Sequence, residues 1–415
     1  MTSPAKPRAD LILIGATEIV TCVPASGDPI GRIRDGAIAI AGDHILAVGR
    51  TTEVMAQVDT GSAERVDASS KILAPGFVDC HTHLVFGGSR VQEYAARLTR
   101  DLADVQALGI PTGIIATVGM TRAESAAQLS MSAAQRLQRM FRSGTTTVES
   151  KSGYGLTIAD ELKLLEVNRA LQAIQPVDIV STFLGAHAFP REHSHGRYVD
   201  MVVHEMIPQV AERALAEFCD VFCDDGYFSA NESRRILEAG RAAGLKPKIH
   251  ADQYAAIEGS AVAAQAGVVS ADHLNYTTRA DMQRLAEAGV VGVVTPALDF
   301  AVRHPRPFDA RAMLAEGLTL ALATDLCPAC WVESMQLVMT LACRLYRLSP
   351  EEALYAATVG GAKALGLDDR GRLAPGQLAD IQVWDLPSFE DVVYRIGNNA
   401  VVAVVKRGKL HPFNV

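Results

Sequence analysis

Apolar positions along this chain fall into short runs that alternate with longer segments of helical periodicity. Residues 72–78, 145–148 and 177–183 are compact apolar runs, as expected of strands that are buried on both faces. Residues 122–142 and 158–173 space their apolar side chains as an amphipathic helix does. A regular alternation of strand and helix predicts a parallel sheet covered by helices.

The two ends of the chain have β character instead. Residues 9–20 and 36–48 are β-rich runs separated by a Gly/Pro/Asp turn region at 24–34. Alternation typical of strands returns at 371–384 and 401–409, so we expect both ends to build one small β structure.

The length of 415 residues allows two such parts, because single hydrophobic cores stop growing at about 250–300 residues. The sequence therefore predicts an α/β protein. Residues 71–370 are expected to form a (β/α)8 TIM barrel, and residues 1–70 and 371–415 a small β-sandwich domain.

Composition narrows the class of partner. The chain is 49% hydrophobic and 21% charged, with a net charge of −8 and no basic cluster, which argues against nucleic acid or an anionic membrane as the partner. No apolar stretch approaches the roughly 20 residues of a membrane span. The expected ligand is therefore a small molecule. Seven cysteines without a secretory signal indicate reduced thiols in a cytoplasmic protein.

The first chemical signal is an apolar strand, 75–80, that leads into His81 and His83. Side chains at i and i+2 of a strand share a face, so both can reach one ion. An isolated His-x-His is more often a hydrogen-bonded or surface pair. In this chain, however, further predicted strand ends also carry side chains that can bind a metal or take part in catalysis. Active sites of barrels are built at these carboxyl ends. The additional residues are His187, His250, His273 and Asp325.

This arrangement resembles the amidohydrolase superfamily, and within it the imidazolonepropionase family. Those enzymes of histidine degradation open the ring of imidazolone propionate to formiminoglutamate. The segments that carry the resemblance extend through nearly the whole chain: 75–90, 144–156, 182–190, 220–223, 248–253, 270–274 and 333–343.

The resemblance implies a role for each matching residue. His81, His83, His250 and Asp325 would hold one divalent metal per chain, with zinc expected and iron or manganese as alternatives. Asp325 would also accept a proton from the attacking water. His273 would hold that water or polarise the substrate.

The resemblance also implies a set of substrate-binding residues. Arg90 would pair with the propionate carboxylate, which a guanidinium fork matches in bidentate fashion, although a surface salt bridge is its alternative interpretation. Tyr154, His187 and, less directly, Gln253 would contact the substrate. A homodimer is also expected from the family.

The chain departs from the family beside Asp325. Where the family has Asn-Pro-Gly followed by Ser or Thr, this chain has Cys327-Pro-Ala-Cys330, and a family tyrosine corresponds to Ala103. A redox pair is disfavoured, because such motifs occupy a helix N-terminus in thioredoxin-like sheets. A zinc knuckle lacks its second cysteine pair. The two thiols are therefore either small packing residues or contacts to a substrate sulfur.

Thiols that contact a substrate sulfur would fit a relative of the family, 3-(5-oxo-2-thioxoimidazolidin-4-yl)propionate desulfhydrase, an enzyme of ergothioneine degradation. The leading prediction is accordingly sulfide release from a thioxo ring, and ring opening of imidazolone propionate is the alternative. Cys327 and Cys330 are candidate catalytic or substrate-binding residues, with Cys327 either packing or attacking carbon as a thiolate. A non-catalytic metal-binding barrel is disfavoured, since all the expected ligands are present.

Overall fold

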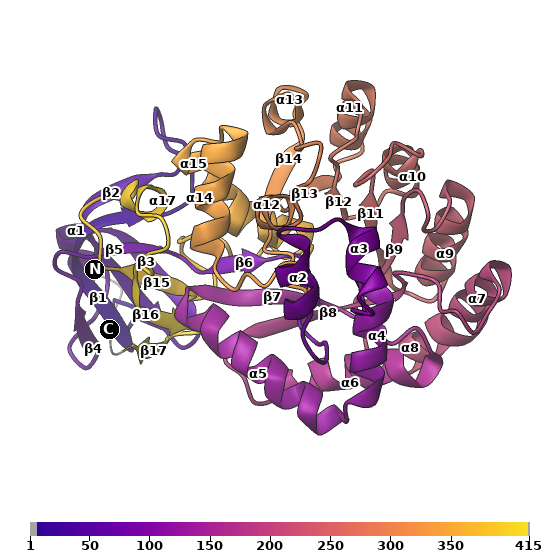
Figure 1. The fold of residues 1–415 in the computed structure, drawn as a ribbon. Helices are drawn as coiled ribbons and strands as arrows, with labels where there is room; N and C mark the ends of the chain where they lie inside the picture. Colours follow the sequence, from indigo (N-terminus) through magenta and orange to yellow (C-terminus); the bar gives the residue numbers. More distant parts are fainter. Residues whose placement is uncertain (1–5, 414–415) are drawn as a thin grey trace.

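Short apolar strands form a nearly closed parallel sheet in the middle of the chain (Figure 1), in a computed structural model that describes residues 6–413. Eight strands follow one another in chain order around this sheet, and a further short strand, β10 (Lys246–Pro247), pairs with one of them, β9 (Phe218–Cys223). The eight are β6 (Phe77–Asp79), β7 (Thr145–Lys151), β8 (Asp178–Ala186), β9 (Phe218–Cys223), β11 (Ile249–Ala251), β12 (Ser270–His273), β13 (Val291–Val294) and β14 (Thr319–Leu322).

The first and last of these strands meet just beyond their ends. Thr82 and Leu326 form a parallel bridge, and the backbone N–H of Asp325 donates to the His81 carbonyl oxygen at 3.1 Å. These contacts join the segments that follow β6 and β14. The predicted parallel barrel is confirmed.

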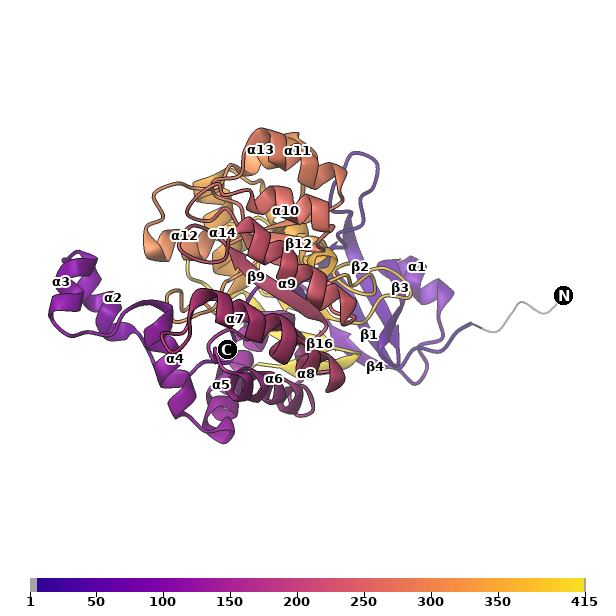
Figure 2. The same ribbon diagram turned by 90° about the vertical axis from the view of Figure 1, so that its right-hand side faces the viewer.

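Helices cover the outside of the barrel (Figures 1 and 2). They are α5 (Ala126–Arg142), α6 (Ile158–Gln172), α7 (His195–Met201), α8 (Ile207–Glu212), α9 (Ala230–Ala242), α10 (Gly259–Ala266), α11 (Arg279–Glu287), α12 (Pro296–Val302), α13 (Ala310–Ala315), α14 (Met335–Tyr346), α15 (Pro350–Tyr355) and α16 (Gly361–Ala364), with π-helical turns at Val202–Met206 and Ala356–Gly360. No helix within residues 6–413 has both the length and the apolar character needed to cross a membrane.

Helix α5 shows why these segments are helical. Ser125 and Gln128 form a reciprocal capping box that satisfies backbone donors of the first turn. Leu129, Ala133 and Leu137 then recur on one face and are buried. The predicted helix 122–142 begins in fact at Ala126, because the cap at Ser125 separates it from the preceding helix α4 (Gly113–Ala123).

A second sheet joins the two ends of the chain, and its indigo and yellow strands lie side by side in Figure 1. Its eight strands are β1 (Leu11–Val20), β2 (Arg32–Ala41), β3 (His44–Arg50), β4 (Glu64–Asp67), β5 (Ile72–Pro75), β15 (Ile381–Trp384), β16 (Val401–Lys406) and β17 (Lys409–Pro412). Leu13, Leu73, Ile381 and Val405 share one buried cluster, so early and late strands have a common core. The predicted β module made from both ends is confirmed, and α1 (Thr51–Gln57) and α17 (Asp391–Tyr394) accompany it.

The connection between β6 and β7 is the longest excursion from the barrel. It contains α2 (Val91–Arg97), α3 (Leu102–Ala107) and α4 (Gly113–Ala123). Figure 2 shows α2 and α3 projecting from the rest of the molecule. This excursion contributes one wall of the candidate site.

Candidate metal centre and active site

The barrel brings the four expected metal ligands together at the carboxyl ends of its strands. His81 and His83 follow β6, His250 lies in β11, and Asp325 follows β14. The Nε2 atoms of His81 and His83 lie 3.6 and 3.8 Å from Oδ1 of Asp325. Ligand atoms of the three histidines lie within 4.8 Å of one another, and all four side chains are buried.

The hydrogen bonds of these histidines fit a divalent metal. Nδ1 of His81 lies 2.7 Å from Asp272 Oδ2, and Nδ1 of His250 lies 3.1 Å from Asp220 Oδ1. A carboxylate only accepts, so each Nδ1 carries the proton and each Nε2 has its lone pair available. Both Nε2 atoms are buried without a hydrogen-bond partner among residues 6–413. Buried polar atoms are rarely left in this state, and a bound cation would satisfy them.

The ionisation behaviour of the cluster supports the same assignment. Burial lowers the pKa of His81, His83 and His273 well below the usual range, so the imidazoles are neutral, as metal ligands must be. Burial raises the pKa of Asp325 to about 7. A cation beside this carboxylate would offset the cost of burying its charge.

His273 completes the cluster at the end of β12. It forms a second potential ligand group with His81 and Asp325, and Thr295 Oγ1 lies 3.3 Å from its Nδ1. His273 and Asp325 both have left-handed backbones, with φ of 78° and 48°. Non-glycine residues adopt this conformation at a cost, and such strain is concentrated at functional sites.

A cavity of about 670 Å³ opens over this cluster. Five of the residues expected to contact substrate border it together with four of the cluster residues, and these nine residues come from six different strand ends. The cavity residues that matter here are His83, His250, His273, Asp325, Arg90, Tyr154, His187, Gln253 and Cys327.

Arg90 lies in the wall formed by the α2 excursion. Its Nε and Nη2 atoms donate to Glu93 at 2.6 and 2.9 Å, and its side chain is only 12% exposed. The pair is therefore not the open surface salt bridge that the sequence left as an alternative. Glu93 was not anticipated, since nothing in its sequence context distinguishes it from a solvent-exposed helix residue.

Tyr154 and His187 stand beside His83. The His83 and His187 rings are stacked with centroids 4.7 Å apart, and the Tyr154 ring is 5.3 Å from His83. Burial lowers the pKa of His187 to about 3, and its Nδ1 lies 3.1 Å from the Gly153 carbonyl oxygen. A neutral His187 that donates from Nδ1 offers Nε2 as an acceptor.

The segment after His250 is held by a residue that the sequence did not indicate. Asp224 accepts backbone N–H bonds from Gln253, Tyr254 and Ala255 at 2.7–3.0 Å. It therefore fixes the backbone on which Gln253 reaches the cavity. Adjacent acidic residues are common on surfaces, so the sequence Cys223-Asp-Asp gave no sign of this role.

The structure separates the two thiols that the sequence grouped together. Cys327 lies in the cavity wall, whereas Cys330 is fully buried behind it and directs Sγ to the Thr324 carbonyl oxygen at 3.6 Å. Their backbones pair in both directions at 3.0 Å in an antiparallel bridge. Cys330 is thus not placed to contact substrate, contrary to expectation. Burial raises the pKa of both thiols, which favours the neutral forms.

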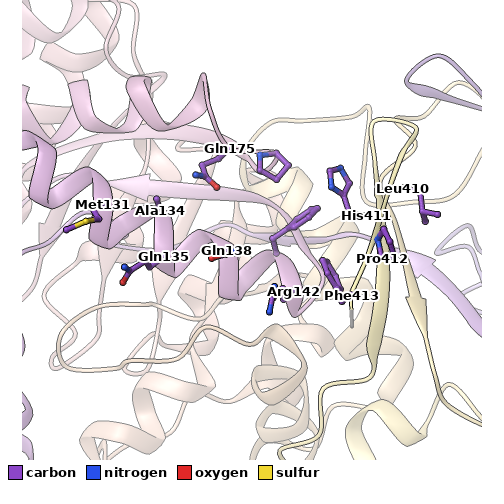
Figure 3. A pocket seen from close by; sticks show the side chains of 12 residues that line it. Met131, Ala134, Gln135, Gln138, Arg142, Gln175, Leu410, His411, Pro412 and Phe413 are labelled. Atoms are coloured by element: carbon purple, nitrogen blue, oxygen red, sulfur yellow. The ribbon is translucent and has the colours of Figure 1, made fainter. Parts of the chain in front are cut away.

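A second cavity, of about 650 Å³, lies elsewhere, between α5 and β17 (Figure 3). Met131, Phe141, His411 and Phe413 are among the residues that line it, and it shares no residue with the cavity over the histidines. It has no cluster of catalytic groups and is not part of the candidate site.

A parallel barrel with this histidine and aspartate cluster at its carboxyl end defines a metal-dependent hydrolase of the amidohydrolase class. The profile of the amidohydrolase family matches residues 105–411. Imidazolonepropionase from Symbiobacterium thermophilum is 43% identical, covering 97% of both chains, and that from Shouchella clausii is 42% identical, covering 96% of this chain and 92% of its own. The chain belongs to the imidazolonepropionase family, whose members are hydrolases acting on a cyclic amide.

Solved structures agree with this fold. An adenosine deaminase from Xanthomonas campestris with bound zinc has a TM-score of 0.75 at 20% identity and covers 98% of this chain and 93% of its own. A triazine hydrolase variant has a TM-score of 0.75 at 18% identity, covering 96% and 94%. At these identities the likeness concerns architecture only.

These relatives change the balance between the two predicted reactions. Several imidazolonepropionases match this chain over nearly its full length, which supports the ring-opening alternative and gives no support to sulfide release as the leading prediction. Membership of this enzyme family also removes the non-catalytic barrel from consideration.

Proposed function

We propose that this protein hydrolyses imidazolone propionate, opening the five-membered ring to formiminoglutamate. The observation that carries the proposal is that one cavity is bordered both by the metal-ligand cluster and by Arg90. A metal held by this cluster can activate water for attack on a cyclic amide. The Arg90 guanidinium can bind a propionate carboxylate. The full-length similarity to imidazolonepropionases supports the same substrate.

His81, His83, His250 and Asp325 would hold the metal. When bound, a divalent ion such as zinc supplies Lewis acidity and lowers the pKa of a water to about 7. Asp325 would take the proton of the attacking water as its oxygen adds to the ring carbonyl carbon. His273 would orient that carbonyl. Asp325 would then return the proton to the ring nitrogen as the carbon–nitrogen bond breaks.

The remaining cavity residues would position the substrate. Arg90 is held by Glu93 through Nε and Nη2, so its orientation is fixed before substrate arrives. Its other N–H groups would donate to the propionate carboxylate. Nε2 of His187 would accept from a ring N–H, while Tyr154 and Gln253 would complete the wall around the ring.

A second candidate reaction, sulfide release from the thioxo ring, rests on one observation. Cys327 borders the cavity at a position where the family motif implies an amide side chain. A thiol is soft and only a weak donor, which suits contact with a large sulfur atom. Water would add to the thioxo carbon, the carbon–sulfur bond would break, and sulfide would leave with a proton.

One experiment decides between the two reactions. The wild-type enzyme should be given imidazolone propionate and the thioxo compound separately, with ring opening and sulfide release both assayed. We expect efficient ring opening and little sulfide. Rapid sulfide release with negligible ring opening would overturn the proposal in favour of the second reaction.

Replacement of Cys327 tests the role of its thiol. The burial of Cys327 indicates only that its thiol packs in the cavity wall. Cys327→Ala should therefore reduce kcat/KM about tenfold, equivalent to about 1.4 kcal/mol. Cys330→Ser, behind the cavity wall, is the control and should leave KM unchanged. Near-complete loss in Cys327→Ala, with the fold retained, would instead indicate a nucleophile.

We expect about one divalent metal per chain, with zinc as the native ion. A second cation is not needed at the neighbouring acidic pair, because the Lys151 ammonium lies 2.7 Å from Asp220 and 3.1 Å from Asp272. Elemental analysis of the purified protein would check this. Two metals per chain, or full activity of chelator-treated protein, would contradict it.

The homodimer expected from the family remains part of the proposal. Light scattering of the purified protein would give its mass in solution, and a mass equal to that of one chain would contradict a dimer.

A further inference from the structure

Five charged side chains are fully buried inside the barrel beneath the histidine cluster. Glu149 and Lys151 come from β7, Asp220 from β9 and Asp272 from β12, and Lys248 precedes β11; each is 0% exposed. Burying charges costs free energy that their mutual attraction often fails to recover, and apolar packing can serve a fold as well. The network therefore calls for an explanation beyond stability.

Its contacts lead directly to the metal ligands. Lys151 Nζ lies 2.7 Å from Asp220 Oδ2 and 3.1 Å from Asp272 Oδ2. Asp220 in turn accepts from His250 Nδ1 at 3.1 Å, and Asp272 accepts from His81 Nδ1 at 2.7 Å. One ammonium thus joins the two carboxylates that orient two separate ligands.

We propose that Lys151 is a positioning residue of the metal centre, acting on His81 and His250 through Asp272 and Asp220. The carboxylates hold the Nδ1–H form of each imidazole, which leaves Nε2 to bind the ion. Oxygen atoms of the two carboxylates lie within 4.8 Å of each other, where like charges repel. The Lys151 ammonium between them removes this repulsion and keeps both carboxylates on their histidines.

Lys248 provides a natural comparison within the same network. Its Nζ lies 2.8 Å from Glu149 Oε2 and 3.3 Å from the Cys80 carbonyl oxygen, whereas Lys151 contacts the other oxygen of Glu149 at 3.0 Å. Among residues 6–413, no hydrogen bond or ion pair joins Lys248 to Asp220 or Asp272. The two lysines share burial, charge and one partner, but of the two only Lys151 makes ion pairs with the carboxylates that hold the metal ligands.

The proposal concerns how the ligands are held and is independent of the substrate. It is tested by metal affinity, measured by competition with a chelator on the metal-free protein, and by the visible absorption spectrum of the cobalt(II)-loaded protein. A wild-type protein that binds no metal would defeat the proposed function. Normal metal binding in both the wild type and the Lys151 variants would defeat this inference alone.

Lys151→Met should weaken binding of zinc and cobalt(II) by about 10- to 100-fold and alter the cobalt(II) spectrum, as loss of support for ligating histidines does elsewhere. Lys248→Met, the matched control, should stay within about threefold of the wild type and keep its spectrum. Equal affinities of the two folded variants would overturn the proposal.

Because either single variant leaves an extra buried negative charge, both could fail to fold. Two charge-balanced variants then decide the question: Lys151→Met/Glu149→Gln and Lys248→Met/Glu149→Gln. Each removes one positive and one negative charge, and they differ only in which lysine remains. The first should bind metal at least about tenfold more weakly than the second. Equal binding by this pair would also overturn the proposal.

Discussion

His81→Ala should lower kcat/KM by more than about 1,000-fold, because a metal that activates water and polarises the substrate contributes several kcal/mol to lowering the barrier. His81 is fully buried, approaches Asp325 through Nε2 and is oriented by Asp272 through Nδ1. An alanine supplies neither contact. Steady-state kinetics and elemental analysis of the same preparation would measure both consequences, and we expect metal content to fall with activity.

Two further variants sharpen this test. Asp325→Asn removes the proton acceptor and a ligand charge, so a comparable loss of activity is expected. His44→Ala, at a half-exposed histidine of β3 paired with Asp43, is the control and should retain full activity and metal. If metal-depleted His81→Ala kept wild-type turnover, the assigned metal centre would be wrong.

Arg90→Met should raise KM for imidazolone propionate about 100-fold while changing kcat little, because charge-assisted hydrogen bonds to a carboxylate contribute about 1.5–3 kcal/mol. The propionate is remote from the bond that breaks, so its binding is the same in ground and transition states. Arg90→Lys should raise KM about tenfold, since a point charge cannot reproduce the guanidinium fork. Initial-rate kinetics on both variants would check these values.

The control for the Arg90 variants is Arg97→Met, because Arg97 lies near the same Glu93 carboxylate. Arg97 borders the cavity, lies 3.9 Å from Glu93 and is 48% exposed, so Arg97→Met should change KM by less than about threefold. Because Arg90→Met removes the two short hydrogen bonds that Arg90 makes to the buried Glu93, Arg90→Met/Glu93→Gln should reproduce the KM change with better stability. An equal loss on a substrate analogue without the carboxylate would show that Arg90 does not bind that group.

The order of elements in the barrel could be predicted because parallel strands are buried on both faces and therefore appear in the sequence as short apolar runs. Local breaks were harder to predict. Residues 36–48 form the hairpin β2–β3, not one run, with a turn at Gly42, whose φ is 59°. The two strands have the same apolar character, so a periodic pattern alone does not show where the chain reverses.

The sequence determined which side chains could form the metal cluster, since ligands follow strand ends in recognisable motifs and the barrel gathers those ends. It did not determine the partners of those side chains. The Arg90–Glu93 pair, the burial of Cys330 and the junction of Asp220 and Asp272 at Lys151 depend on side-chain directions and on strands far apart in the chain. Contacts of this kind leave no periodic pattern in a sequence, and only packing of the closed barrel decides them.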